Sequence, residues 1–247
     1  MAQQTGILGL KGTVGGLVFA KDGSVRQKPA SNKAAFASKG SMSRTRENAS
    51  EFGAAGSAGK TLREALRSAV QGAKDKFMVG RLTKLMREII GLDTTSVRGY
   101  RVVKKANAAL RLPGFNFNGG ASLSSTFFAP YTVGLVGAVA TITIPDFAPL
   151  LDVTIPQGAT HVEIVAAAAS IDWATGVYST ATLVGPAPIE FGSVAEQQEL
   201  TLTLPAAPAA GDTTVVAMGV NFYQEVNGQM YPLNNNASNP LAIVYVG

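Results

Sequence analysis

The sequence predicts an α+β protein in which an N-terminal β-hairpin and a helical segment precede an antiparallel β-sandwich. Residues 45–92 repeat apolar side chains with the period of an amphipathic helix. Residues 123–247 alternate β-prone runs with turn residues, and lysine and arginine stop at Arg111. We therefore expect three segments: an N-terminal strand and hairpin arm over 1–30, a basic helical region and junction over 31–112, and an acidic sandwich domain over 113–247.

The first segment is expected to form short strands over residues 6–30. The apolar run 17–19 and Val25 flank Asp22-Gly23, a pair that is typical of a type I′ hairpin turn. The small, polar and basic residues 31–44 predict a loop or an extended arm.

Two helices are predicted over residues 45–92. The first carries an apolar stripe at i, i+3 and i+4 spacing, formed by Leu62, Ala65, Leu66, Ala69 and Val70. Gly72 interrupts this pattern, which resumes from Met78 to Ile90, and Gly91 is expected to cap the second helix. Three glycines precede the stripe and indicate either close helix packing or a weak helix: Gly53, Gly56 and Gly59.

A junction over 93–120 contains a predicted strand at 100–103, and we place the domain boundary at 112–122. Strands are then expected at 125–136, 138–144, 160–170, 177–184, 197–204, 213–225, 229–233 and 240–246. Turns such as Asn227-Gly228 separate them. Short strands without helices between them predict an immunoglobulin-like sandwich, with Trp173, the only tryptophan, in its core.

Charge is sorted along the chain. All 21 lysines and arginines lie between Lys11 and Arg111, where only seven acids accompany them, for a net charge of +14. Residues 112–247 hold nine acids and no lysine or arginine, for a net charge of −9. Such asymmetry indicates partners of opposite sign for each part of the chain.

The composition also excludes several classes of site. The chain has no cysteine, so disulfides and thiolate metal sites are excluded, and its single histidine, His161, excludes a multi-histidine metal site. We predict no catalytic, cofactor or metal site and no small-molecule substrate. No apolar run reaches the roughly 20 residues that a membrane-spanning helix needs. The N-terminus lacks the basic start of a secretory signal. Localisation therefore stays open, with synthesis in the cytoplasm followed by assembly or by export along a non-standard route.

Two sequence motifs are candidates for a catalytic role. The stretch from Gly53 to Thr61 resembles a phosphate-binding loop, but Ala54 stands where that pattern requires glycine. We therefore interpret its small residues as a helix contact, with Lys60 exposed beside it. His161 and Glu163 alternate on a predicted strand and share a face. A solvated polar strand face explains this pair better than catalysis does.

Three motifs together resemble an uncharacterised bacterial protein family: an LKG-type start at residues 10–15, RTRxN at 44–48 with EFG at 51–53 and AGK at 58–60, and FFAPY at 127–131. The resemblance covers most of the chain. It implies an N-terminal hairpin, a helix and a β-rich C-terminal domain, and it implies no activity and no functional residues.

From charge and pattern we expect a self-assembling structural protein, a homo-oligomeric subunit of a filament, tube or virion-like particle. Basic and acidic parts of successive copies would meet head to tail, and N-terminal strands would be exchanged. The residues expected at the interface are Leu17, Phe19, Arg26, Arg63, Arg67, Arg81 and Lys84. Two alternatives remain open. One is a nucleic-acid-binding protein that uses the basic segment, and the other is a surface or adhesive module.

Overall fold

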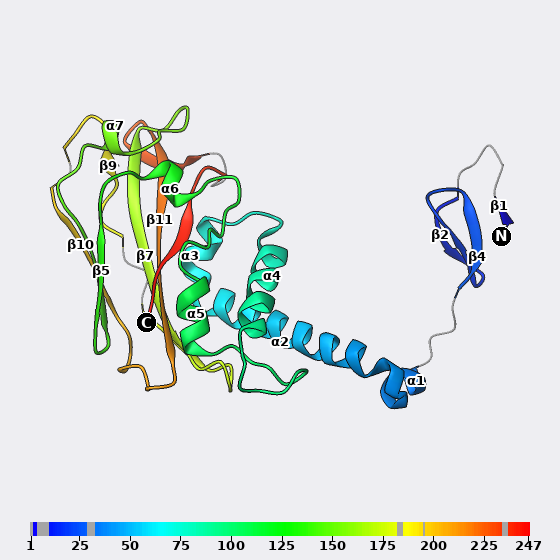
Figure 1. Cartoon of the computed structure of the whole chain (residues 1–247). Coiled ribbons are helices and arrows are strands. Elements are labelled where there is room, and N and C mark those ends of the chain that lie inside the picture. The colour runs from blue at the N-terminus through cyan, green and yellow to red at the C-terminus, as the bar shows by residue number, and fades with distance from the viewer. Residues whose placement is uncertain (1, 4–9, 29–32, 182–184, 195, 234–236) are drawn as a thin grey trace. The chain divides into compact units, whose positions relative to one another are not determined.

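The structure is a computed structural model that describes the whole chain except residues 1, 4–9, 29–32, 182–184, 195 and 234–236 (Figure 1). It forms two compact units, Met1–Arg46 and Glu47–Gly247. These units differ from the three segments expected from the sequence. No division falls near residues 112–122, because the helices that precede this stretch share one apolar core with the strands that follow it.

A small antiparallel sheet forms most of the first unit, with the strand order β1-β4-β3-β2. Its strands are β1 (Ala2–Gln3), β2 (Gly12–Val14), β3 (Leu17–Phe19) and β4 (Ser24–Gln27). The helix α1 (Lys33–Ser38) and the 3-10 turn η1 (Gly40–Met42) follow. The prediction of a loop or arm over 31–44 is therefore wrong for these residues, where alanines favour helix.

The turns of this sheet also differ from the prediction. Gly15 and Gly16, with φ of +56° and +83°, form the tight two-residue turn between β2 and β3. Asp22 lies in a wider turn that the hydrogen bond from Ala20 N to Ser24 O closes at 2.9 Å. The Asp22 carboxylate accepts hydrogen bonds from the Ser24 amide and hydroxyl, which explains its place in this turn.

Four helices precede the sheets of the second unit: α2 (Ser43–Ala65), which crosses the division between units, α3 (Arg67–Gly72), α4 (Met78–Gly91) and α5 (Lys105–Arg111). The predicted apolar stripe is confirmed, since Leu62, Leu66 and Leu82 are buried. Gly91 is not the cap, because it is the last residue of α4 and the C-cap is Leu92, with φ of −79°. Residues 100–103 form no strand.

Two antiparallel sheets complete the second unit. The smaller has the order β10-β6-β5; the larger has the order β12-β11-β7-β8, with β13 beside β11 and β9 beside β7. Their strands are β5 (Thr132–Val136), β6 (Val139–Ile144), β7 (His161–Ile171), β8 (Tyr178–Thr180), β9 (Ile189–Glu190), β10 (Gln198–Thr203), β11 (Thr213–Val226), β12 (Gln229–Pro232) and β13 (Leu241–Val246). The short helices α6 (Leu123–Thr126) and α7 (Pro149–Asp152) lie between strands. Every predicted strand interval after residue 123 overlaps an observed strand.

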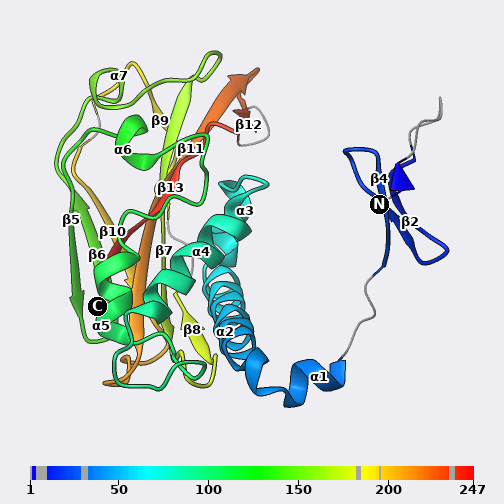
Figure 2. The ribbon, with the colours of Figure 1, turned by 45° about the vertical axis from the view of Figure 1, so that its right-hand side comes forward.

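The larger sheet is buried on both faces. On one face Ile164 and Met218 pack against the smaller sheet. On the other face Ala167 and Ala217 pack against the helices. Figures 1 and 2 show α3, α4 and α5 on one side of β7 and β11, and β5 and β10 on the other. This double burial explains why β7 reads as a continuous apolar run, and its alanines leave room for the helices to approach.

The mixed α+β class with antiparallel sheets is confirmed, but the immunoglobulin-like sandwich is not. A helical layer covers one face of the larger sheet, so the sheets do not stand as a two-layer sandwich. Trp173 is half-buried against this helix-side core, and its Nε1 donates a hydrogen bond to Thr213 Oγ1 at 2.8 Å. The prediction that Trp173 fills the core between two sheets is therefore wrong.

Candidate functional site

Among the described residues of the small N-terminal sheet, one apolar face has no buried core packed against it. Register places Val14, Leu17, Phe19 and Val25 on the same face, since β3 pairs Leu17 with Val14 and Phe19 with Val25. All four are exposed or half-buried. Arg26, expected at the same interface, pairs with Val18 and lies on the opposite face. A sheet this small gains little stability from its own burial, so its apolar face is a candidate docking surface.

The ion pairs of the second unit stay within one part of the sequence. Those that involve lysine or arginine are Lys60–Glu64, Arg81–Asp75, Arg87–Glu51, Arg98–Glu47 and Arg101–Glu51. Within the described part of Glu47–Gly247, no lysine or arginine pairs with an acid that follows residue 111. The two charged parts of the sequence therefore do not neutralise each other inside this unit.

Arg81, expected at an interface, is instead part of the internal structure. Its Nη2 lies 2.5 Å from the Asp75 carboxylate, and its guanidinium donates hydrogen bonds to the carbonyl oxygens of Asn116 and Phe117 at 2.7 and 3.1 Å. The guanidinium also lies over the ring of Phe115. Arg81 thus holds the segment before α6 against α4, and few of its donors remain for a partner.

Three basic side chains without internal partners surround a hollow of about 260 Å³ beside α3. Arg63 and Arg67 lie one helical turn apart, and Lys74 follows α3. These three side chains make no hydrogen bond or ion pair with any described residue. Glu64 also lines the hollow, but its carboxylate faces Lys60 at 3.7 Å. We name this feature the basic hollow.

Lys84, the remaining residue expected at an interface, lines a different and more open hollow of about 550 Å³. Glu88 and the internally bonded Arg81 line it too, so its charge is mixed. The structure therefore brings Arg63 and Arg67 together and separates them from Lys84. Lys74 completes the basic hollow and was missing from the sequence prediction, because nothing in its spacing relates it to Arg63.

Most acidic side chains of residues 112–247 make polar contacts within the fold. Asp152, Asp172 and Asp212 accept hydrogen bonds from nearby turn residues. Glu163 and Glu225 face other polar side chains of the sheet. The other four are exposed, and their carboxylates make no hydrogen bond or ion pair with a described residue: Asp146, Glu190, Glu196 and Glu199. Three of these four lie close together in the sequence: Glu190 ends β9, Glu196 precedes β10 and Glu199 lies within β10. We name these three side chains the acidic connection.

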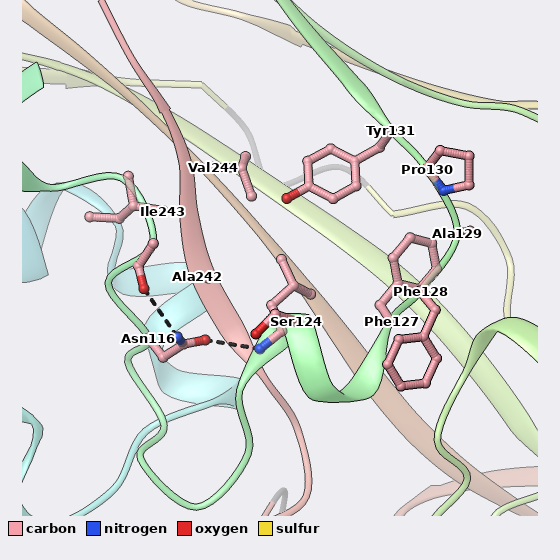
Figure 3. A pocket seen from close by; sticks show the side chains of 12 residues that line it. Asn116, Ser124, Phe127, Phe128, Ala129, Pro130, Tyr131, Ala242, Ile243 and Val244 are labelled. Atoms are coloured by element: carbon pink, nitrogen blue, oxygen red, sulfur yellow. Dashed lines mark hydrogen bonds between the residues drawn. The ribbon is translucent and has the colours of Figure 1, made fainter. Parts of the chain in front are cut away.

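An apolar groove of about 440 Å³ lies between β13 and the segment that leads into β5. Phe128 and Tyr131 form one side, and Figure 3 shows the Tyr131 hydroxyl pointing across toward Val244. Asn116 is held by two hydrogen bonds, from its Nδ2 to Gly114 O and from Leu123 N to its Oδ1. None of the lining residues carries a formal charge, and the groove offers mainly apolar contact.

His161 and Glu163 belong to a satisfied polar network and do not form the solvated face expected from the sequence. Only 8% of His161 is exposed, and its Nδ1 lies 2.9 Å from Thr160 Oγ1. Glu163 accepts hydrogen bonds from Asn221 Nδ2 at 3.1 Å and from the Tyr223 hydroxyl at 2.6 Å. Burial, together with this bond to Glu163, raises the pKa of Tyr223 to about 12. Tyr223 therefore stays protonated and serves as a donor.

The chain is thus a mixed α+β protein whose notable surfaces are charged or apolar patches. Among the residues that the structure describes, no cluster of three or more His, Asp or Glu side chains is arranged to hold a metal ion. The helices described are all too short or too polar to cross a membrane. No protein-family model, curated protein or solved structure matches this chain.

Proposed function

We propose that this protein is a self-assembling structural subunit, joined head to tail by contacts between basic and acidic surfaces and reinforced by its N-terminal sheet. The observation that supports the proposal is that, among the described residues, the basic and acidic parts of the sequence also stay unpaired in the folded unit. Helix-borne cations and sheet-borne acids share one compact unit, yet no ion pair joins them within its described part. Surfaces of opposite sign on one body attract the complementary surfaces of other copies.

The N-terminal unit supports the same proposal. Residues 1–46 carry eight lysines and arginines and one acid, a net charge of +7. Their sheet exposes an apolar face that includes Leu17 and Phe19. A cationic element with an uncovered apolar face fits a neutral or anionic partner surface, and residues 112–247 of another copy contain no lysine or arginine to oppose it.

Sedimentation of the full chain over a range of protein and salt concentrations tests the proposal, with electron microscopy of the same samples. We expect oligomers that grow with protein concentration at low salt and dissociate as salt screens the charged contacts. A chain that stays monomeric at high concentration and low salt would overturn the proposal. A steep, salt-dependent affinity for DNA or RNA in such a monomer would favour the nucleic-acid alternative.

A further inference from the structure

We infer that the basic hollow of one copy receives the acidic connection, Glu190, Glu196 and Glu199, of the next copy. This inference rests on the proposed function and deepens it, because it assigns the two halves of the head-to-tail contact to named side chains.

The basic hollow gathers three cationic side chains, Arg63, Arg67 and Lys74, on one concave surface. Arg63 near the end of α2 and Arg67 at the start of α3 both line the hollow, so two like charges are gathered there. No acid of the described chain relieves the repulsion between them, since Glu64 is turned to Lys60. Guanidinium groups bind carboxylates through paired hydrogen bonds. The hollow is therefore suited to a carboxylate that comes from outside the unit.

The occupant follows by elimination among the acids of residues 112–247. Five of the nine are engaged inside the fold, and three of the other four form the acidic connection. Glu190, Glu196 and Glu199 are exposed, and their carboxylates make no hydrogen bond or ion pair with a described residue. The acidic connection thus presents up to three carboxylates to a hollow with three cations.

The two surfaces lie on different layers of the same body. The basic hollow belongs to the helical layer, whereas β10, which carries Glu199 of the acidic connection, belongs to the smaller sheet on the other side of the larger sheet (Figures 1 and 2). A contact between these surfaces joins the basic hollow of one copy to the acidic connection of another. Each copy that is added therefore leaves one hollow and one acidic connection unoccupied at the two ends of the assembly. Contacts of this kind build rings or open filaments.

Charge reversal with complementation tests the inference. Arg63→Glu/Arg67→Glu changes the hollow, and Glu190→Lys/Glu196→Lys/Glu199→Lys changes the acidic connection. We expect each variant alone to assemble at least tenfold more weakly than the natural chain in sedimentation at low salt. An equimolar mixture is expected to recover assembly, because the unaltered hollow of one variant meets the unaltered acidic connection of the other.

Lys104→Glu/Lys105→Glu provides the matched control, since it makes the same change in net charge at the start of α5. The inference is overturned if this control weakens assembly as much as the hollow variant does, or if the mixture stays dissociated. It is also overturned, with the proposed function intact, if the natural chain assembles and reversal of the hollow leaves assembly unchanged. A hollow variant that loses only affinity for inorganic phosphate or an oligonucleotide would assign the hollow to phosphate instead. A natural chain that never assembles overturns both proposals.

Discussion

Arg87 on α4 lies 2.7 Å from the buried carboxylate of Glu51 on α2, measured from Nη2 to Oε2. The other oxygen of Glu51 accepts a hydrogen bond from Gly99 N at 2.8 Å and lies 3.8 Å from Arg101 Nε. One acid on α2 therefore holds both α4 and the loop that follows α4. Glu51 is the first residue of the EFG motif, so this structural role explains why the motif begins with an acid.

Replacement of Glu51 by leucine is expected to lower the free energy of unfolding by about 3 kcal/mol, because two arginines lose the carboxylate that compensates them. Urea unfolding at one fixed protein concentration measures this loss. Glu64→Gln is the control, since its exposed pair with Lys60 contributes about 0.5 kcal/mol or less. Equal losses in the two variants would show that the buried pair is no more stabilising than the exposed one.

Asp93 makes stability depend on acid pH. Hydrogen bonds from Ser96 and then Thr95 hold its pKa well below the ordinary value of 3.8, although burial acts in the opposite direction. A carboxyl with a lowered pKa in the folded state stabilises the fold above its unfolded pKa, and this contribution is lost as pH falls through the folded value.

We therefore expect the gap in unfolding free energy between the natural chain and Asp93→Asn to be largest near neutral pH and to shrink below about pH 4. Urea unfolding at a series of pH values measures the gap. The exposed Asp146, replaced by asparagine, is the control and is expected to change stability little. A gap for Asp93→Asn that is constant from neutral to acid pH would contradict this account.

Gly219 marks the closest backbone approach between β11 and the segment before β13. A Cβ atom at this position would lie 2.7 Å from Pro240 O, so Gly219→Ala is expected to cost about 1–3 kcal/mol of stability. Gly134→Ala on β5 meets open space and is expected to be near neutral. Thermal unfolding of both variants compares them directly. If Gly219→Ala leaves the stability unchanged, the segment before β13 can move away from β11 at no cost in free energy, and the prediction is contradicted.

Arg81 and Lys84 separate structural from surface cations on the same helix. Arg81→Gln is expected to lower the free energy of unfolding by about 2 kcal/mol, because Asp75 and two carbonyl groups lose a charged donor. Lys84→Gln removes the same charge and is expected to change stability by less than about 0.5 kcal/mol. Urea unfolding of the pair tests the assignment, which fails if the two variants are equally stable.

The apolar face of the N-terminal sheet is expected to matter for assembly and not for the stability of the second unit. Leu17→Asp/Phe19→Asp places two carboxylates on that face, whereas Thr13→Asp/Val18→Asp places them on the opposite face. We expect only the first variant to weaken assembly in sedimentation, by tenfold or more, with the thermal unfolding of both unchanged. Equal weakening would point to net charge instead of apolar contact.

Local patterns in the sequence predicted the strands after residue 123 and the stripe around Leu62, because period and turn chemistry act over a few residues. The same locality explains two errors. The sequence could not tell that β7 is covered by helices on its second face, nor that Asp22 lies in a wider turn while Gly15-Gly16 form the tight one.

The sorting of charge was determined by the sequence alone, since it is a property of order along the chain. Only the tertiary structure decided which charges remain for a partner. Arg63, Arg67 and Arg81 are equivalent in the sequence, yet folding turns Arg81 inward to Asp75 and leaves the other two beside Lys74. The physical reason is that an ion pair depends on distance in space, and the residues that meet at these sites come from separate elements whose packing no local pattern records.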